Sequence, residues 1–305
     1  MQSNQITYNV GMSIFGPIVT AMVTPFNEDG TVNYKQAVEL MDYLIQNKTT
    51  SILLTGTTGE SPTLSHDEEY ELYRLAVKYF KGKAHLMAGT GSNCTKTAIE
   101  STKMAAEIGM DSTLQVVPYY NKPCQDGIFN HFRAIADSTN LPIMIYNIPG
   151  RTGINMTADT VKRCSKIPNI IALKEAAGSV DQMKEFRRAC PFDFHLYAGD
   201  DGLLLDFMKE GASGVVSVAS HLAGQQIHDM ISAFNNHDMT SAESLNNILQ
   251  PLFDVLFITS NPIPVKAALK CIGFNCGRTR PPLMDITADQ QQQVESVLDA
   301  FFEKV

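Results

Sequence analysis

Eight short apolar runs alternate with longer amphipathic segments along the first 236 residues of the chain. The runs lie at 17–23, 51–55, 85–89, 113–117, 142–146, 170–173, 194–198 and 214–218. Each run is nearly continuous in hydrophobic residues, which is typical of parallel strands that are buried on both faces. Successive runs begin about 20 to 35 residues apart, the length of one strand–helix unit. Eight such units predict an α/β fold, a closed (β/α)8 TIM barrel; the pattern alone leaves a doubly wound open sheet as the alternative.

The segments between the runs carry the end signals of helices. Ser65 and Glu68 stand at the spacing of a capping box, in which each side chain binds the other residue's backbone N–H. Gly109 follows an apolar helical stripe, as the glycine after a helix C-terminus often does. Thr287 stands where the N-cap of a last helix is expected. These signals predict helices between the strands of the barrel.

The pattern changes after residue 236. From there on only helical periodicity is found, at 240–258, 263–273 and 288–304. We therefore expect three parts: a flexible N-terminal extension at 1–13, the catalytic barrel at 14–236 and a small all-helical C-terminal domain at 237–305.

Charge and composition exclude several classes of protein. Acidic residues outnumber basic ones by 32 to 24, so the net charge of −8 supplies no basic surface for non-specific nucleic-acid binding. No stretch approaches the ~20 apolar residues of a membrane span. The polar first ten residues lack the basic and apolar regions of a signal peptide. A cytoplasmic protein is expected, with no nucleic-acid or membrane partner.

The cysteines and histidines do not indicate a metal site. Six cysteines are scattered, with no CxxC pair, and seven histidines form no HxxxH or HExxH spacing. We expect no catalytic zinc and reduced, buried thiols.

Lys174 is the most informative single residue, because it follows the apolar run 170–173 directly. At that place in a barrel a lysine points into the mouth, where burial lowers its pKa and frees an amine for attack on a carbonyl. Schiff-base chemistry requires such an amine. The structural alternative is a lysine that extends to solvent at a strand end.

Three further motifs follow predicted strands: GTTGE at 56–60, PYYNKP at 118–123 and YNIPGRTG at 146–153. The hydroxyls of Thr57 and Thr58, with nearby backbone N–H groups, can hold a carboxylate. Tyr146 can pass protons, and Arg151 can bind a carboxylate through two parallel hydrogen bonds. Taken singly, each motif is also compatible with a turn, a packed aromatic pair or a surface ion pair.

Taken together with ALKEAAG at 172–178, the motifs resemble the dihydrodipicolinate synthase family of the pyruvate-dependent class I aldolase and N-acetylneuraminate lyase superfamily. The resemblance extends from Gly16 to the helical tail. It implies condensation of pyruvate with L-aspartate-4-semialdehyde through a lysine Schiff base. The product is 4-hydroxy-tetrahydrodipicolinate, in the first committed step of diaminopimelate and lysine biosynthesis. No metal or organic cofactor is implied.

The resemblance also implies residue roles and an assembly. It implies an imine on Lys174 and a proton relay made of Tyr146, Thr57 and Tyr120. It also implies that Thr58 binds the carboxylate of pyruvate and Arg151 that of the semialdehyde. Gly199 and Val216 would line the pyruvate end of the pocket. In the family, the tyrosine that matches Tyr120 reaches the site of the neighbouring subunit. A tight dimer is therefore implied, commonly within a homotetramer.

Two other functions compete with this one. An N-acetylneuraminate lyase or another sugar-acid aldolase would use the same lysine and tyrosine, but such enzymes generally lack the arginine found at Arg151. A catalytically silent barrel would be expected to have lost a member of the lysine, tyrosine and threonine set, which is present here at Lys174, Tyr146 and Thr57.

Feedback inhibition by lysine is expected to be weak. Feedback-sensitive members of the family usually carry a histidine and a glutamate where this chain has Glu69 and Thr97. A threonine hydroxyl cannot neutralise the ammonium of a bound lysine, as the carboxylate would. The rest of the family's lysine cluster is matched by Ser61, His66, Asn93 and Tyr119.

Overall fold

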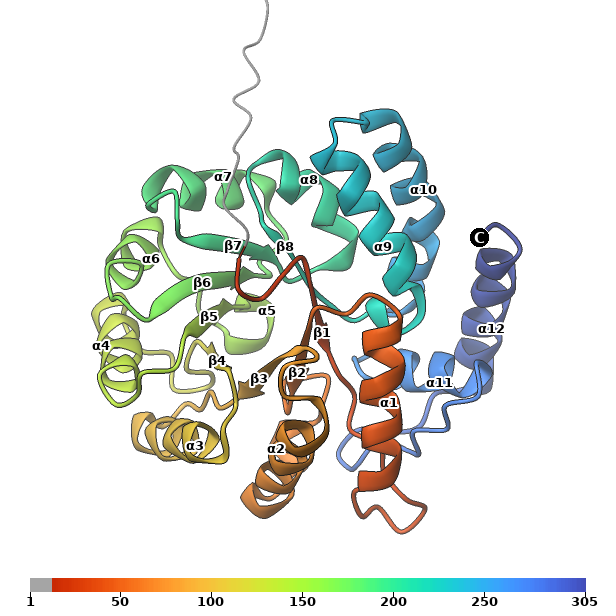
Figure 1. Ribbon diagram of the computed structural model, residues 1–305, viewed down its shortest axis with the longest axis horizontal. Helices are drawn as coiled ribbons and strands as arrows, with labels where there is room; N and C mark the ends of the chain where they lie inside the picture. The colour runs from red at the N-terminus through yellow and green to blue at the C-terminus, as the bar shows by residue number, and fades with distance from the viewer. Residues whose placement is uncertain (1–12) are drawn as a thin grey trace, which may run out of the picture.

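Eight parallel strands close into a barrel in the computed structural model, which describes residues 13–305 (Figure 1). Each strand pairs with the next, and β8 pairs with β1, so the predicted TIM barrel is confirmed and the doubly wound open sheet is excluded. The extension expected at 1–13 lies outside the described residues except for its last position. The strands are β1 (Ile18–Ala21), β2 (Ser51–Leu54), β3 (His85–Gly89), β4 (Ser112–Val116), β5 (Ile143–Asn147), β6 (Ile170–Glu175), β7 (His195–Ala198) and β8 (Gly214–Ser217).

Helices surround the barrel (Figure 1). Those that follow the strands are α1 (Tyr34–Gln46), α2 (His66–Phe80), α3 (Thr95–Ile108), α4 (Gln125–Ala136), α6 (Ala158–Cys164), α7 (Val180–Ala189), α8 (Leu204–Lys209) and α9 (Ser220–Asn235). Three short helical turns that the sequence pattern did not predict lie in loops at the carboxyl ends of strands: η1 (Ser61–Thr63), α5 (Pro149–Thr152) and η2 (Asp201–Leu203).

The predicted helix ends are confirmed. Ser65 Oγ accepts the N–H of Glu68 at 3.3 Å, and Glu68 Oε2 accepts the N–H of Ser65 at 2.9 Å, so the capping box is complete. Gly109 ends α3 in the left-handed region, with φ 102°. Thr287 caps the last helix in a second capping box, with Gln290.

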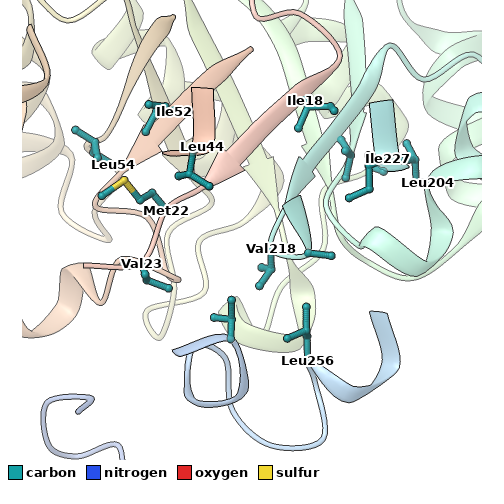
Figure 2. Packing of buried hydrophobic residues seen from close by; sticks show 14 of the residues in the cluster. Ile18, Met22, Val23, Leu44, Ile52, Leu54, Leu204, Val218, Ile227 and Leu256 are labelled. Atoms are coloured by element: carbon teal, nitrogen blue, oxygen red, sulfur yellow. The ribbon is translucent and has the colours of Figure 1, made fainter. Parts of the chain in front are cut away.

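Two layers of apolar side chains make up the core. One fills the barrel interior, and the other lies between the strands and the surrounding helices. Figure 2 shows this outer layer, where Ile18 and Ile52 of the strands lie near Leu44 of α1 and Ile227 of α9. Side chains along a strand alternate between the two layers, as the period of two requires.

The amino end of the barrel interior is filled by aromatic side chains. Phe15 packs edge-on against Tyr197 and His85, with ring centroids 6.0 and 5.2 Å apart. The hydroxyl of Tyr197 donates to the carbonyl of Gly16 at 2.7 Å. The interior is thus closed at this end, so a site would lie at the carboxyl end of the strands, as in other barrels of this kind.

Three helices follow the barrel: α10 (Met239–Val255), α11 (Ile263–Cys271) and α12 (Ala288–Phe302). The expected helical region after 236 is confirmed, and α10 packs against α9. The segment after α11 returns to the barrel, where the N–H of Phe26 donates to the carbonyl of Cys276 at 3.0 Å. The domain boundaries at 14–236 and 237–305 stay predictions.

The cysteines are free, but the expectation that they are buried is wrong for most of them. Cys164 and Cys276 are buried, whereas Cys94, Cys124 and Cys271 are exposed. Cys94 and Cys124 are the N-cap residues of α3 and α4, which are exposed helix starts. Within residues 13–305 no helix is long and apolar enough to span a bilayer. The same residues hold no cluster of His, Cys, Asp or Glu suited to a metal ion.

Candidate active site

Lys174 and Tyr146 face each other inside the carboxyl end of the barrel. β5 and β6 pair with Tyr146 opposite Lys174, so both side chains point into the interior. The Lys174 Nζ lies 4.2 Å from the centroid of the Tyr146 ring. β6 continues to Glu175, so Lys174 lies within the strand and not after it, and only 7% of the residue is exposed.

Burial lowers the pKa of Lys174 to about 8. The nearby carboxyl of Asp201 opposes this shift in pKa, and the positive charge of Arg151 adds to it. At neutral pH roughly one such lysine in ten carries a free amine, against fewer than about one in a thousand with an ordinary pKa. Lys174 is therefore a competent nucleophile at the base of the mouth.

Tyr146 is buried beside the amine and is hydrogen-bonded to the side chain of Thr57. Burial raises the pKa of its phenol, and the charge of Arg151 and the Thr57 hydrogen bond oppose this only in part. The phenol is neutral over the physiological range, so it can pass a proton along a hydroxyl chain but cannot serve as a free phenolate. The structure thus brings together three of the predicted residues, Lys174, Tyr146 and Thr57.

Tyr120 is not assembled with these three residues in the described chain. Its residue is 90% exposed, and its backbone is in the left-handed region, with φ 72°. A tyrosine in that conformation is both strained and exposed, which is unusual for a side chain without a partner surface.

Thr58 is 3% exposed and accepts a hydrogen bond from the Asn261 Nδ2 at 2.9 Å. It lies in the loop between β2 and η1, which begins and ends with left-handed residues, Thr55 at φ 52° and Glu60 at φ 57°. Gly59 is tightly surrounded by backbone, because a Cβ there would lie 3.1 Å from the carbonyl oxygen of Met22 and 3.1 Å from the Cα of Thr55. The loop therefore has a fixed and crowded backbone.

Arg151 lies in α5 and is exposed, while the loop beneath it is held by buried polar groups. Asn147 Oδ1 accepts the N–H of Met156 at 3.0 Å. Its Nδ2 donates to Asn155 Oδ1 at 2.7 Å and to Glu175 Oε2 at 2.9 Å. Because Arg151 is exposed, its guanidinium can meet a ligand at the mouth. It also lies near enough to lower the pKa values of Lys174 and Tyr146.

Gly199 and Val216 line the wall beside the lysine. A Cβ at Gly199 would lie 2.7 Å from the Ala176 Cβ and 3.1 Å from the Lys174 Cε, so glycine is required where the lysine side chain passes. Val216 is 2% exposed and belongs to the interior cluster with Tyr146. All predicted site residues except Tyr120 thus lie around one opening.

The model of the dihydrodipicolinate synthetase family matches residues 14–301. The chain belongs to this family. A relative from Nostoc sp., named 4-hydroxy-tetrahydrodipicolinate synthase, is 53% identical over 94% of the chain and 98% of the relative. One from Desulforamulus reducens with the same name is 49% identical over 93% of the chain and 97% of the relative.

Solved structures of the family agree with the fold. The dihydrodipicolinate synthase of Cyanidioschyzon merolae, solved with lysine bound, superposes with a TM-score of 0.93 at 50% identity. The match covers 95% of this chain and 99% of that one. The Bacillus anthracis synthase gives a TM-score of 0.92 at 45% identity, over 95% and 99% of the two chains.

Two residues at the site were missed by the sequence analysis. Asp201 is 2% exposed, and its Oδ2 accepts the N–H groups of Val218 and Ala219 at 2.9 and 3.0 Å. Its place three residues after the predicted strand at 194–198 was a signal that could have found it. Asn261 carried no such signal, because it lies 203 residues from its partner Thr58.

Proposed function

We propose that this chain condenses pyruvate with L-aspartate-4-semialdehyde to give 4-hydroxy-tetrahydrodipicolinate, through a Schiff base on Lys174. The observation that carries the proposal is the buried Lys174 amine, with its lowered pKa, against Tyr146 at the open end of the barrel. The activity is the one for which the family relatives are named.

The chemistry begins with attack of the Lys174 amine on the ketone carbon of pyruvate. The carbinolamine loses water and becomes a protonated imine. Loss of a proton from the methyl carbon gives an enamine, whose carbon forms a bond with the aldehyde carbon of the second substrate. The amino group of that substrate then attacks the imine carbon, which closes the ring and releases Lys174. One water is lost overall. The protonated imine accepts the electrons when the methyl proton leaves and when the amino group attacks, whereas in the carbon–carbon bond step the aldehyde oxygen accepts them and takes up a proton to become the hydroxyl.

Tyr146 and Thr57 are proposed to move the protons of these steps. The side chains of Tyr146 and Thr57 interact directly, and the Tyr146 ring lies beside the lysine amine. Thr58, with its hydroxyl fixed by Asn261, is proposed to bind the carboxylate of pyruvate, and Gly199 and Val216 to line the pyruvate end. A neutral phenol beside a hydroxyl can accept and return a proton without a lasting charge.

Trapping with borohydride tests the proposed function. The protein is incubated with pyruvate, reduced, and weighed by mass spectrometry. A mass gain that maps to the peptide of Lys174 supports the proposal, and a protein without any gain contradicts it. In a separate assay without borohydride, the aldehyde that the enzyme condenses with pyruvate separates this activity from a sugar-acid aldolase.

Arg151 is proposed to receive the carboxylate of the semialdehyde. We expect Arg151→Ala to raise the KM for the semialdehyde about 10-fold, with little change for pyruvate, because a charge-assisted hydrogen-bond pair that is desolvated on binding is worth about 1.5 kcal/mol. Equal effects on both KM values would indicate a structural role for Arg151.

The same variant should also change the pH dependence of imine formation. Free amine is present above the pKa of Lys174, so imine formation should fall as pH drops below about 8. Removing Arg151 raises the pKa of Lys174 and should move that fall to higher pH.

Tyr120 is proposed to complete the relay of a second copy of the chain, which makes the tight dimer the working unit. Its exposure and strained backbone support this placement. Mixing Tyr120→Phe subunits with Lys174→Ala subunits should restore activity above that of either parent, because some hybrid sites contain both intact groups. Failure of every mixture to recover activity would contradict the shared site. Pairing of dimers into a homotetramer stays a prediction, which sedimentation would test.

Weak inhibition by lysine stays our expectation for this chain. The carboxylate of Glu69 is held by Ser61 Oγ at 2.9 Å and His66 Nδ1 at 3.0 Å. Burial raises the pKa of Glu69, so the carboxyl is a poor substitute for the charge that Thr97 lacks. We expect half-inhibition only above about 1 mM lysine, a binding energy weaker than about −4.1 kcal/mol. Initial rates across a lysine titration would show this, and inhibition at lower concentrations would contradict it.

A cytoplasmic location also stays a prediction. It rests on the sequence and on the biosynthetic activity for which the relatives are named. Fractionation of cells that express the chain would test it.

A further inference from the structure

The loop that carries Thr57 and Thr58 is held in a strained conformation at both ends. Thr55 and Glu60 are left-handed residues with side chains, a conformation that persists only where surrounding contacts impose it. At the first end, Thr55 Oγ1 bonds to the Tyr73 hydroxyl and to the carbonyl of Gly89 at 3.1 Å. These contacts come from α2 and β3, the neighbouring elements of the barrel.

The second end of the loop is held from the C-terminal region. The Glu60 Oε1 lies 2.7 Å from the Lys266 Nζ of α11, and the two side chains are 1% and 4% exposed. The other carboxylate oxygen, Oε2, accepts the N–H of Arg280 at 2.8 Å. Glu60 is thus fixed by two groups that lie more than 200 residues further along the chain.

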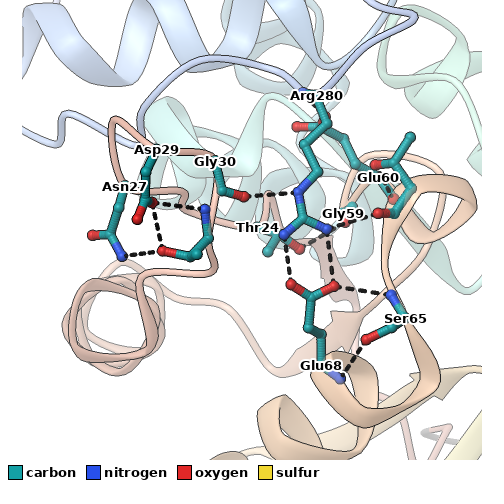
Figure 3. A network of polar contacts seen from close by, with 11 residues as sticks. Thr24, Asn27, Asp29, Gly30, Gly59, Glu60, Ser65, Glu68 and Arg280 are labelled. Carbon is teal, nitrogen blue, oxygen red and sulfur yellow. Dashed lines mark hydrogen bonds and ion pairs between the residues drawn. The ribbon is translucent and has the colours of Figure 1, made fainter.

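The groups that fix Glu60 are themselves held in place. Figure 3 shows the Arg280 guanidinium between Gly30 and Glu68. It donates to the Gly30 carbonyl at 2.9 Å and to both Glu68 oxygens, at 2.9 and 2.5 Å. The Lys266 Nζ lies 4.2 Å from the centroid of the Phe26 ring. The network leaves Glu60 little freedom to move.

A second contact from the same region reaches the same loop. Asn261, just before α11, donates to the Thr58 hydroxyl at 2.9 Å, and both residues are buried. The segment 261–280 therefore fixes positions 58 and 60, on either side of Gly59. Packing of the C-terminal helices against the barrel does not by itself require these two polar contacts.

Stability does not by itself account for a buried ion pair at this place. Removing two charges from water is costly, and apolar residues of similar volume often stabilise a fold as well or better. Burial lowers the pKa of Lys266, and the carboxylate of Glu60 opposes that shift. The ion pair instead fixes the position of one end of the loop, whose backbone is already strained.

We infer that Lys266 and Glu60 are positioning residues for pyruvate: through them the C-terminal helical region sets the geometry of the loop that binds the substrate carboxylate. The inference rests on the proposed function, because it takes the loop at 56–60 to be the carboxylate site. A positioning role predicts an effect on pyruvate affinity beyond any effect on stability.

The test compares Lys266→Met and Glu60→Gln with wild type, and uses Lys270→Met as the matched control. Lys270 lies on the same helix but is exposed. The pyruvate concentration for half-maximal borohydride trapping is measured together with Tm. We expect both network variants to raise this concentration about 10-fold and Lys270→Met to leave it unchanged. The KM for the semialdehyde and trapping at saturating pyruvate should change little.

The double variant sharpens the result. Because Lys266 acts on the loop through Glu60, Glu60→Gln with Lys266→Met should raise the half-saturating concentration no more than the larger single effect. A lowered Tm with unchanged half-saturation would overturn the inference, since the pair would then be structural only. If Lys266→Met does not fold, Glu60→Gln decides, and failure of both to fold would also overturn it. Absence of trapping in wild type would instead refute the proposed function.

Discussion

Replacing Lys174 by alanine is expected to abolish imine formation and to lower kcat at least ~10³-fold, because no other group at the site can supply the covalent step. Lys174→Arg should fare no better, since a guanidinium stays protonated and is not a nucleophile. Mass spectrometry after pyruvate and borohydride treatment, together with steady-state rates, measures both effects.

Two checks make the Lys174 result decisive. Circular dichroism should be unchanged, because the lysine lies at the open end of the barrel and not in its apolar layers. Exposed Lys270, changed to alanine, should trap pyruvate as wild type does. Measurable trapping in either Lys174 variant would show that another amine forms the imine.

Gly199→Ala is expected to lower kcat/KM for pyruvate about 100-fold, as misplacing a reacting group by about 1 Å commonly does. The added methyl would lie 3.1 Å from the Lys174 Cε and 2.7 Å from the Ala176 Cβ. It would also lie 2.9 Å from the carbonyl oxygen of Glu175, so the end of β6 must shift together with the lysine, and the amine should move away from the ketone. Rates and the pH dependence of trapping measure the effect.

Gly150→Ala is the matched control for that prediction. A Cβ at Gly150 would meet nothing within 4 Å, although the residue lies beside Arg151 at the same opening. It should keep nearly full activity toward pyruvate. An active Gly199→Ala enzyme would mean that the lysine side chain does not need this passage.

The barrel could be predicted from sequence because its strands are local signals. Near-continuous apolar runs separated by capped helices specify eight parallel strands, and each predicted run contains an observed strand to within one or two residues. The same pattern placed Lys174 at the right end of the barrel. Its exact position within β6 was missed, because the strand continues through the polar residues Lys174 and Glu175.

The remaining parts of the site depend on contacts between distant segments. The bonds of Asn261 to Thr58 and of Lys266 to Glu60 join residues more than 200 positions apart, and no local pattern marks them. Asp201 acts on the pKa of Lys174 from another strand end. Such pairs follow from how the C-terminal region returns to the barrel, which hydrophobic periodicity does not specify.

The aromatic closure of the amino end has a consequence for the order of events. With Phe15 and Tyr197 filling that end, the proposed reaction requires both substrates to reach Lys174 from the carboxyl end of the barrel, where the product would also leave. Pyruvate bound to the lysine as proposed would occupy the inner part of this shared passage. The released water would then leave by the route through which the semialdehyde enters, and the ring-closed product would depart before another pyruvate arrives. A single entrance thus favours ordered binding of the two substrates and release of the product before the next cycle.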